Sequence, residues 1–268
     1  MDYLYDGSFD GLLTTVYHDY YSGRAEGIHC RDTAYQGSLF SENGKAFSEA
    51  LTPENVTTVD TDLNLADRVY RAIEDKLATA ALPTVYRTFL SNAADKETLI
   101  LRYLRFSFSV GPKADAWHTH PHVQPVQKIA AQVGMEMHGM LGLLRFTDTK
   151  KFLYAPLAPK HNILPLIAEH FSDRLREENF MIHDTRRHLA VVHEAGESWC
   201  LQTLDDQMAE RLEFEASEAS AATQEEIWYQ QLWRRYFETV AIESRRNKRL
   251  QSRFIPQRYR RYLIEFTT

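Results

Sequence analysis

The chain has 268 residues, of which 44% are hydrophobic and 25% charged, and its formal net charge is −6. These ordinary values exclude a fibrous repeat and a chain that is disordered throughout. No apolar run approaches the roughly 18 residues of a membrane span, and the acidic, aromatic start Met1–Asp6 is unlike a signal peptide. Because the only cysteines, Cys30 and Cys200, lie far apart, we expect a cytoplasmic protein without disulfides that does not enter a membrane.

The first part of the chain predicts mostly helices. A short strand at 3–5 precedes an amphipathic helix whose apolar residues recur at helical spacing from Phe9 to Tyr20, and Gly23 follows its end. Weaker strand patterns and then four helical patterns follow in chain order: strands at 33–40 and 55–60, and helices at 64–79, 82–91, 95–109 and 123–138.

Near Gly139 the helical patterns give way to strand patterns. Strand patterns occur at 141–146 and 152–157, which we interpret as a hairpin, and again at 180–183, 189–193 and 199–204. Asn162 is placed to cap a helix between them. The low-complexity segment 215–222 predicts a linker, and Thr223 with Glu226 forms a capping box before a long helix. A short helix follows Pro256.

These patterns predict an α+β protein in which a small antiparallel sheet is flanked by segregated helices. We expect a helix-rich N-terminal part with a short opening strand at 1–120 and an α+β domain ending in a basic helix at 121–268.

Charge is strongly polarised along this second part. Residues 234–261 hold ten basic residues against two acidic ones, a net +8, so the rest of the chain carries −14. Just upstream, residues 204–226 hold eight acids and one base. The basic helix, with Trp233 and Tyr236 among its cations, is suited to phosphate contacts and base stacking. Internal neutralisation by the acidic stretch is an equally good interpretation.

Several common catalytic motifs are absent from the sequence. There is no phosphate loop, no glycine-rich dinucleotide turn and no Gly-x-Ser-x-Gly nucleophile elbow. Two isolated cysteines do not suffice for a four-iron cluster. We therefore expect no cofactor.

The most conspicuous histidine cluster is His118, His120 and His122. On a strand these three imidazoles would share a face and suit a metal such as zinc. An exposed polar loop before a helix is the alternative that we favour, and we assign no metal site.

Acid–base chemistry has three candidate residues. Glu136 lies near a helix end, His170 falls on the apolar face of its helix, and Asp184 ends a strand. Such a group can act as acid and base when its members' environments separate their pKa values. The alternatives are a helix-end charge, a core histidine and a turn-forming aspartate.

Three segments of the second part resemble one known family. They are the run from Glu136 to Phe146, the run from His161 to Phe171 with Arg174, and the triplet Ile182-His183-Asp184. The opening Tyr5–Leu13 and the C-terminal Leu232-Trp233, Arg245-x-Asn247 and Ile255-Pro256-x-Arg258-Tyr259 fit the same pattern. Together they resemble a bacterial family of uncharacterised proteins assigned to DNA metabolism or DNA repair. Gly139 and Lys160 depart from the pattern, since we would expect a basic and an acidic residue there.

The resemblance implies a radical SAM protein as partner, because family members tend to be encoded beside one. It also implies a link to uracil-DNA glycosylases, which are fused to relatives of the C-terminal domain. We therefore expect an accessory protein that binds nucleic acid or nucleotide, with DNA as a candidate partner. The expected contacts are Arg145, Arg174, Arg187, Trp233, Arg245, Arg246, Lys248, Arg249 and Arg258.

Two alternatives to this expectation remain. The chain could be an enzyme acting on a base or nucleotide through Glu136, His170 and Asp184. It could also be a structural subunit whose polar signature residues hold its parts together.

Overall fold

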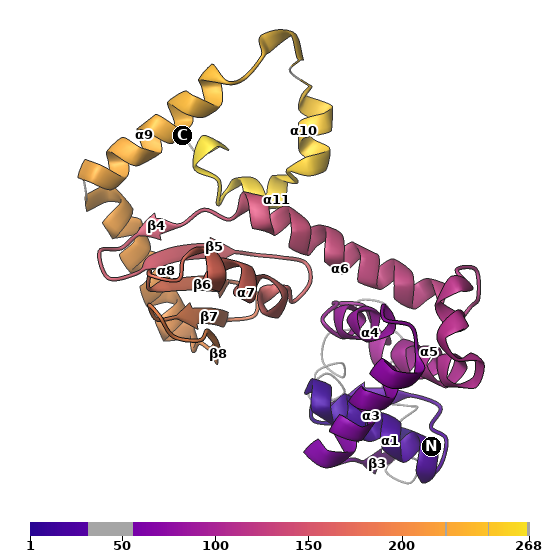
Figure 1. The fold of residues 1–268 in the computed structure, drawn as a ribbon. Helices are drawn as coiled ribbons and strands as arrows, with labels where there is room; N and C mark the ends of the chain where they lie inside the picture. The colour runs from indigo at the N-terminus through magenta and orange to yellow at the C-terminus, as the bar shows by residue number, and fades with distance from the viewer. Residues whose placement is uncertain (32–55, 223, 246, 267–268) are drawn as a thin grey trace, which may run out of the picture. The chain divides into compact units, whose positions relative to one another are not determined.

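The computed structural model describes residues 1–31, 56–222, 224–245 and 247–266 (Figure 1). The chain forms two compact units, Met1–Gly134 and Met135–Thr268, and helix α6 (Gln124–Leu143) contains the boundary between them. The expected strand at 33–40, Thr223 of the expected capping box and Arg246 lie outside the described residues.

The first unit opens with a three-stranded sheet. Strand β1 (Asp2–Tyr5) lies between β2 (Ile28–Cys30) and β3 (Val56–Thr58), and both pairings are parallel. Helix α1 (Phe9–Tyr21) follows β1, and Ser8 caps it because its Oγ accepts a hydrogen bond from the Gly11 amide.

Three further helices among the described residues of this unit confirm the sequence patterns. They are α3 (Leu63–Lys76), α4 (Ala81–Phe89) and α5 (Lys96–Val110), followed by the 3₁₀ turn η3 (Pro112–Ala116). Their apolar faces meet β1 and α1 in one core, in which Leu12, Ile73, Val85 and Ile100 are fully buried. Burial of this apolar stripe is what stabilises helices of this length.

The second unit is built around a five-stranded sheet with the order β4-β5-β6-β7-β8. The strands are β4 (Thr147–Asp148), β5 (Leu153–Leu157), β6 (Phe180–Asp184), β7 (Leu189–His193) and β8 (Cys200–Thr203). The α+β class is confirmed. The sheet is mixed rather than purely antiparallel, because helix α7 (Leu164–Arg174) is a crossover that makes β5 and β6 parallel.

Three local predictions are wrong. Residues 141–143 continue helix α6 instead of opening a strand, since a short apolar run fits either structure. Asn162 does not cap α7, whose N-cap is Ile163, and its Oδ1 is buried with no hydrogen-bond partner among the described residues. The expected linker at 215–222 is helical backbone, because alanine and glutamate are strong helix formers.

The C-terminal part is a succession of helices. After α8 (Asp206–Ala222), the long helix α9 (Gln224–Thr239) confirms the sequence pattern. Then follow η4 (Glu243–Arg245), α10 (Lys248–Phe254), α11 (Gln257–Arg260) and η5 (Ile264–Phe266). In Figure 1, α9 and α10 form two sides of an arch, and the described residues after α11 run back between them.

Candidate nucleic-acid interface

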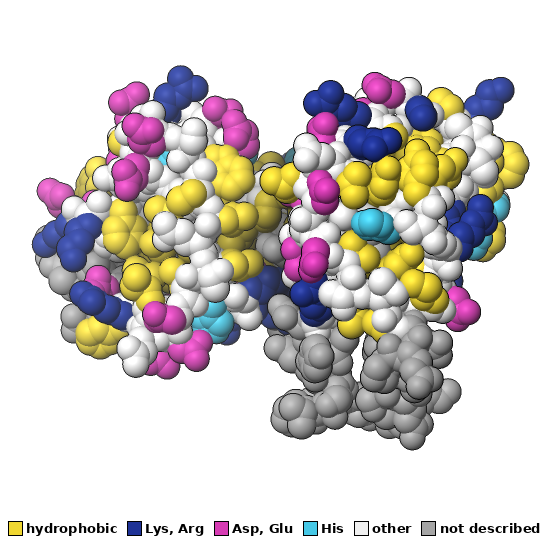
Figure 2. Space-filling view, turned by 90° about the horizontal axis from the view of Figure 1, so that it is seen from below, with side chains coloured by type: hydrophobic (Ala, Val, Ile, Leu, Met, Phe, Trp, Pro, Cys, Tyr) yellow, Lys and Arg dark blue, Asp and Glu magenta, His cyan; other side chains and the backbone are white. Residues whose placement is uncertain are grey.

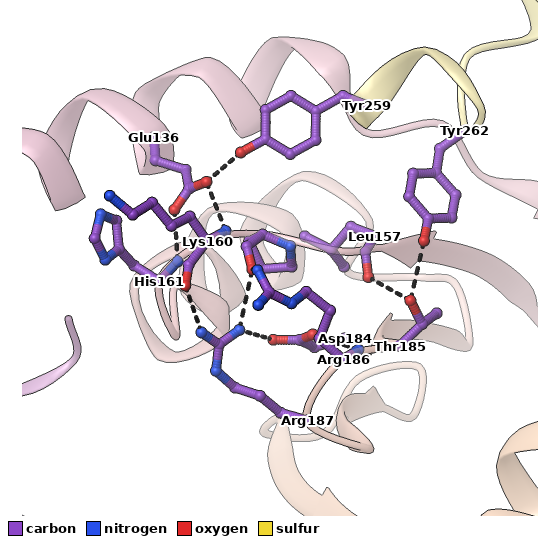
Figure 3. Close-up of polar contacts among 11 residues, drawn as sticks. Glu136, Leu157, Lys160, His161, Asp184, Thr185, Arg186, Arg187, Tyr259 and Tyr262 are labelled. Atoms are coloured by element: carbon purple, nitrogen blue, oxygen red, sulfur yellow. Dashed lines mark hydrogen bonds and ion pairs between the residues drawn. The ribbon is translucent and has the colours of Figure 1, made fainter. Parts of the chain in front are cut away.

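The carboxylate of Glu136 lies at the centre of a polar network on α6 (Figure 3). Its two oxygens accept hydrogen bonds of 2.8 Å from the backbone amides of Lys160 and His161. The Tyr259 hydroxyl donates to the same carboxylate, and the Arg258 guanidinium lies 3.5 Å from it. Only 6% of the Glu136 side chain is exposed. This acid therefore holds both the segment after β5 and the C-terminal helix α11.

Asp184 anchors the opposite side of the same segment. Its side chain is fully buried, and its carboxylate accepts hydrogen bonds from Arg187 Nη1 at 2.7 Å and from the Arg186 amide at 3.0 Å. Arg187 also donates to the carbonyls of Pro159 and Lys160. The segment 159–161 is thus held through its amides by Glu136 and through its carbonyls by Arg187. We call this arrangement the loop clamp.

A second contact fixes the end of the chain. Arg145 Nη2 donates to Glu265 at 2.8 Å, the Trp233 indole donates to the other oxygen of Glu265 at 3.0 Å, and the Arg145 guanidinium stacks 5.0 Å from the Trp233 ring centre. Burial opposes ionisation of Glu265, but its hydrogen bonds from Arg145, the backbone and Trp233 outweigh burial and lower its pKa. Arg145 and Trp233 therefore hold η5 against α6 and α9.

The structure places other predicted residues apart from this network. His170 is exposed on α7 rather than on its apolar face, and its ring meets Phe171 edge-on. Arg174 is exposed at the end of the same helix. A cleft that collects Glu136, His170 and Asp184 is absent from the described part of the chain, because two of the three are engaged in the loop clamp.

The histidine cluster lies in the first unit. His118 contacts Gln127 at 2.9 Å, and the His120 ring stacks on Phe106 with ring centres 3.7 Å apart. Over the described ranges, no group of three or more His, Cys, Asp or Glu side chains is arranged to hold a metal ion.

His183, which the sequence pattern contains beside Asp184, is a fully buried histidine on β6. Its Nδ1 lies 2.8 Å from the Tyr154 hydroxyl, and its Nε2 is buried with no hydrogen-bond partner in the described structure. Burial, together with the nearby His188, lowers the pKa of His183 from 6.5 to about 4. The ring is therefore neutral in the folded protein at pH 7.

We expect this histidine to make stability depend on pH. Between about pH 6.5 and about pH 4 the unfolded chain binds a proton at His183 that the folded chain does not, so stability falls as pH falls through this window. The loss amounts to roughly 3 kcal/mol at the low end. In urea unfolding from pH 7 to pH 4.5, the free energy of unfolding should fall less steeply with falling pH for His183→Gln than for wild type. Equal dependence would contradict this role.

The helices α9 and α10 and the turn η5 line a groove of about 950 Å³. Apolar side chains from these elements line much of it, including Phe237, Val240, Leu250, Phe254 and Phe266. Arg234, Arg245 and Lys248 lie along the same groove. The volume is at the upper end of the range for ligand sites in proteins.

Exposed cations occur on the elements that line this groove. Arg235, Arg245, Lys248, Arg249 and Arg253 are all exposed. In the described structure none of these five forms an ion pair with an acidic side chain. Four other cations of the basic stretch do have polar or aromatic partners, namely Arg234, Arg258, Arg260 and Arg261. Where the side chains of the acidic stretch 204–226 are described, Glu215 pairs with Arg211 and Asp206 lies close to His188.

Large aromatic side chains are exposed on the same elements. Trp228 and Tyr229 are 53% and 63% exposed on α9, Tyr236 is 59% exposed, and Phe254 on α10 is 70% exposed. On the face drawn in Figure 2, hydrophobic side chains likewise reach the surface among charged ones. Exposed aromatics among unpaired cations supply both a stacking surface and phosphate contacts.

The sequence did not reveal which residues form hydrogen bonds with several of the predicted site residues. Glu265 and Tyr262 were not singled out, and Tyr259 was named only as part of a sequence pattern. In the structure Glu265 holds Arg145, Tyr259 holds Glu136, and the Tyr262 hydroxyl lies 3.0 Å from that of Thr185. Burial raises the pKa of Tyr259, and its hydrogen bond to Glu136 raises it further. Such long-range pairs leave no periodic signal in a sequence.

None of the described helices is long and apolar enough to span a membrane.

No curated protein and no solved structure gives a significant match to this chain. One family profile matches over residues 94–265, which is more than half of the chain; its family is described as a domain of unknown function, DUF4130. The matched range contains Glu136, Asp184, the loop clamp and all of the groove's lining residues except Phe266. The chain therefore belongs to the DUF4130 family.

Proposed function

We propose that this protein binds nucleic acid through α9 and α10 and acts in DNA metabolism as an accessory protein. The observation that carries the proposal is the set of five exposed cations without acidic partners, which lie among exposed aromatic side chains on α9, η4 and α10; two of these cations, Arg245 and Lys248, line the groove. Phosphates are the ligands that such a charged surface favours, and every base offers a ring face for stacking.

Part of the predicted interface belongs to this surface and part does not. Arg245, Lys248 and Arg249 are exposed, and the first two line the groove. In contrast, Arg145, Arg187 and Arg258 are engaged by Glu265, Asp184 and Glu136. We therefore assign the phosphate contacts to the first group and extend it with Arg235 and Arg253. Glu136 and Asp184 receive no acid–base role in this proposal, because backbone amides and arginines already occupy them.

A protein partner is the second element of the proposal. The apolar lining of the groove is more extensive than phosphate contacts require, and apolar surface of this kind favours contact with another protein. The sequence resemblance points to a radical SAM protein as that partner. In this arrangement the chain holds the nucleic acid, and the partner supplies the radical chemistry.

Binding should be strongest for single-stranded DNA and should weaken with salt. Fluorescence anisotropy of labelled single- and double-stranded oligonucleotides, from 50 to 200 mM salt, measures both. Five phosphate contacts on a single strand predict a log–log slope of about −3.5. Replacing Tyr229 and Tyr236 by alanine should cost about 1–3 kcal/mol per stacked base on single strands and little on duplex. Absence of binding at 50 mM salt would overturn the proposal.

A further inference from the structure

A second pocket lies in the first unit, between α1, α3 and α5, with a volume of about 480 Å³. Most of its lining residues, including Tyr17, Tyr20 and Arg68, precede residue 94 and so lie outside the range matched by the family profile. Its apolar lining includes Val16, Val69 and Leu104 of the buried core.

One side of this pocket is a cluster of three tyrosines from the last turns of α1. The ring centres of Tyr17 and Tyr21 are 4.5 Å apart at an interplanar angle of 35°, and Tyr20 meets Tyr21 edge-on at 5.0 Å. Tyr20 and Tyr21 are 72% and 64% exposed. Exposed rings beside a pocket offer faces on which a planar aromatic ligand can stack.

A fixed guanidinium lies at the same pocket. Arg105 donates through Nε and Nη2 to the buried carboxylate of Asp19, and Nη2 also donates to the Ala25 carbonyl at 2.7 Å. Its Nη1 makes no hydrogen bond within the described residues, and this atom is not buried. This arginine is therefore held in place with one donor group accessible to a ligand, which reduces the entropy lost when it binds an anion.

The charges of the pocket favour an anion. Four cations line it, namely Arg68, Arg71, Lys76 and Arg105, against the two acids Asp19 and Asp75, a net +2 for the lining residues. Arg71 is paired at 3.0 Å with Asp67 outside the lining, so Arg68 and Arg105 are the cations that we assign to an anion. Arg68 lies 5.0 Å from the Tyr17 ring centre and donates to its hydroxyl, so a cation is already placed beside the aromatic cluster. The pocket thus combines a ring-stacking surface with an anion-binding one.

We propose that this pocket binds a nucleoside monophosphate, free or as one unit of a single strand. The base stacks on Tyr20 and Tyr21, and the phosphate contacts Arg68 and Arg105. The site is separate from the groove of the second unit and does not depend on the function proposed for it. Free nucleotide and strand share this chemistry, and the experiment separates them.

Isothermal titration of the full chain with thymidine monophosphate, thymidine and inorganic phosphate tests the site. The monophosphate should bind at least about tenfold more tightly than either fragment, since both halves of the pocket contribute. The double variant Tyr20→Ala, Tyr21→Ala and the variant Arg68→Ala should each weaken binding roughly tenfold. The matched controls are Tyr70→Ala and Arg102→Ala, which change exposed residues of α3 and α5 outside the pocket.

The same titrations with a short oligothymidylate, in an Arg245→Ala, Lys248→Ala, Arg249→Ala background, identify the source of the ligand. Competition by the oligonucleotide supports a strand site, and binding of the monophosphate alone supports a free-nucleotide site. Absence of monophosphate binding at about 1 mM, or equal losses in the pocket and control variants, would overturn the proposal. Unchanged melting temperatures would show that the variants are folded.

Discussion

Replacing Glu136 by alanine should destabilise the protein by about 3–5 kcal/mol. The change leaves the Lys160 and His161 amides and the Tyr259 hydroxyl without their acceptor. The hydrogen bonds of the His161 amide and the Tyr259 hydroxyl are partly buried, and each such donor that loses its acceptor costs about 1–3 kcal/mol, whereas the exposed Lys160 amide can bond to water instead. Because the carboxylate holds both the segment 159–161 and α11, we expect the loss to loosen both.

Chemical denaturation of Glu136→Ala against wild type measures this loss. Glu136→Gln keeps the shape and one acceptor oxygen, so it should fall between the two. His138→Ala, which changes an exposed residue two positions along the same helix, should alter stability by less than about 0.5 kcal/mol. A Glu136→Ala variant as stable as His138→Ala would contradict the structural role of the carboxylate.

Replacing Asp184 by alanine should have a comparable effect for an electrostatic reason. Asp184 is fully buried, and its removal leaves the Arg187 guanidinium without a counter-charge in a partly buried site. Breaking a buried ion pair by removing one partner costs about 3–5 kcal/mol. The Arg186 amide also loses its acceptor, at 3.0 Å in the wild type.

A double-mutant cycle separates the charge pair from the other effects. If Asp184 and Arg187 act together, removing both should cost clearly less than the sum of the single losses, with a coupling of about 1–3 kcal/mol. Arg174→Ala, an exposed arginine of the same unit, serves as the control. Additive losses of Asp184→Ala and Arg187→Ala would show that the pair is not coupled.

The helices of the first unit were predictable because their apolar residues repeat at helical spacing over long stretches. The patterns at 64–79, 82–91 and 95–109 correspond to α3, α4 and α5 within a few residues. The end of α6 was not predictable, since the apolar run from Met140 to Leu144 fits a strand as well as a helix. The parallel pairing of β5 and β6 depends on the crossover through α7, which no local pattern reveals.

The residue types of the polar network were predictable, but their partners were not. Glu136, Asp184 and Arg187 stand out as charged residues within the sequence pattern. Their pairing through segment 159–161 joins positions 24 to 28 residues apart, and Tyr259 joins Glu136 across 123 residues. The basic stretch was visible as composition, whereas only the structure separates its engaged arginines from its exposed ones.

The most direct test of the proposed interface compares two variants with the same change in net charge. One is Arg245→Ala, Lys248→Ala, Arg249→Ala, and the other is Lys151→Ala, Arg176→Ala, Arg211→Ala, which removes three exposed cations elsewhere in the second unit. Their affinities for one single-stranded oligonucleotide are measured from 50 to 200 mM salt. We expect the first variant to lose affinity and about 2 units of salt slope, because three phosphate contacts are lost, and the second to bind like wild type. Equal losses in both variants would contradict an interface on α9 and α10.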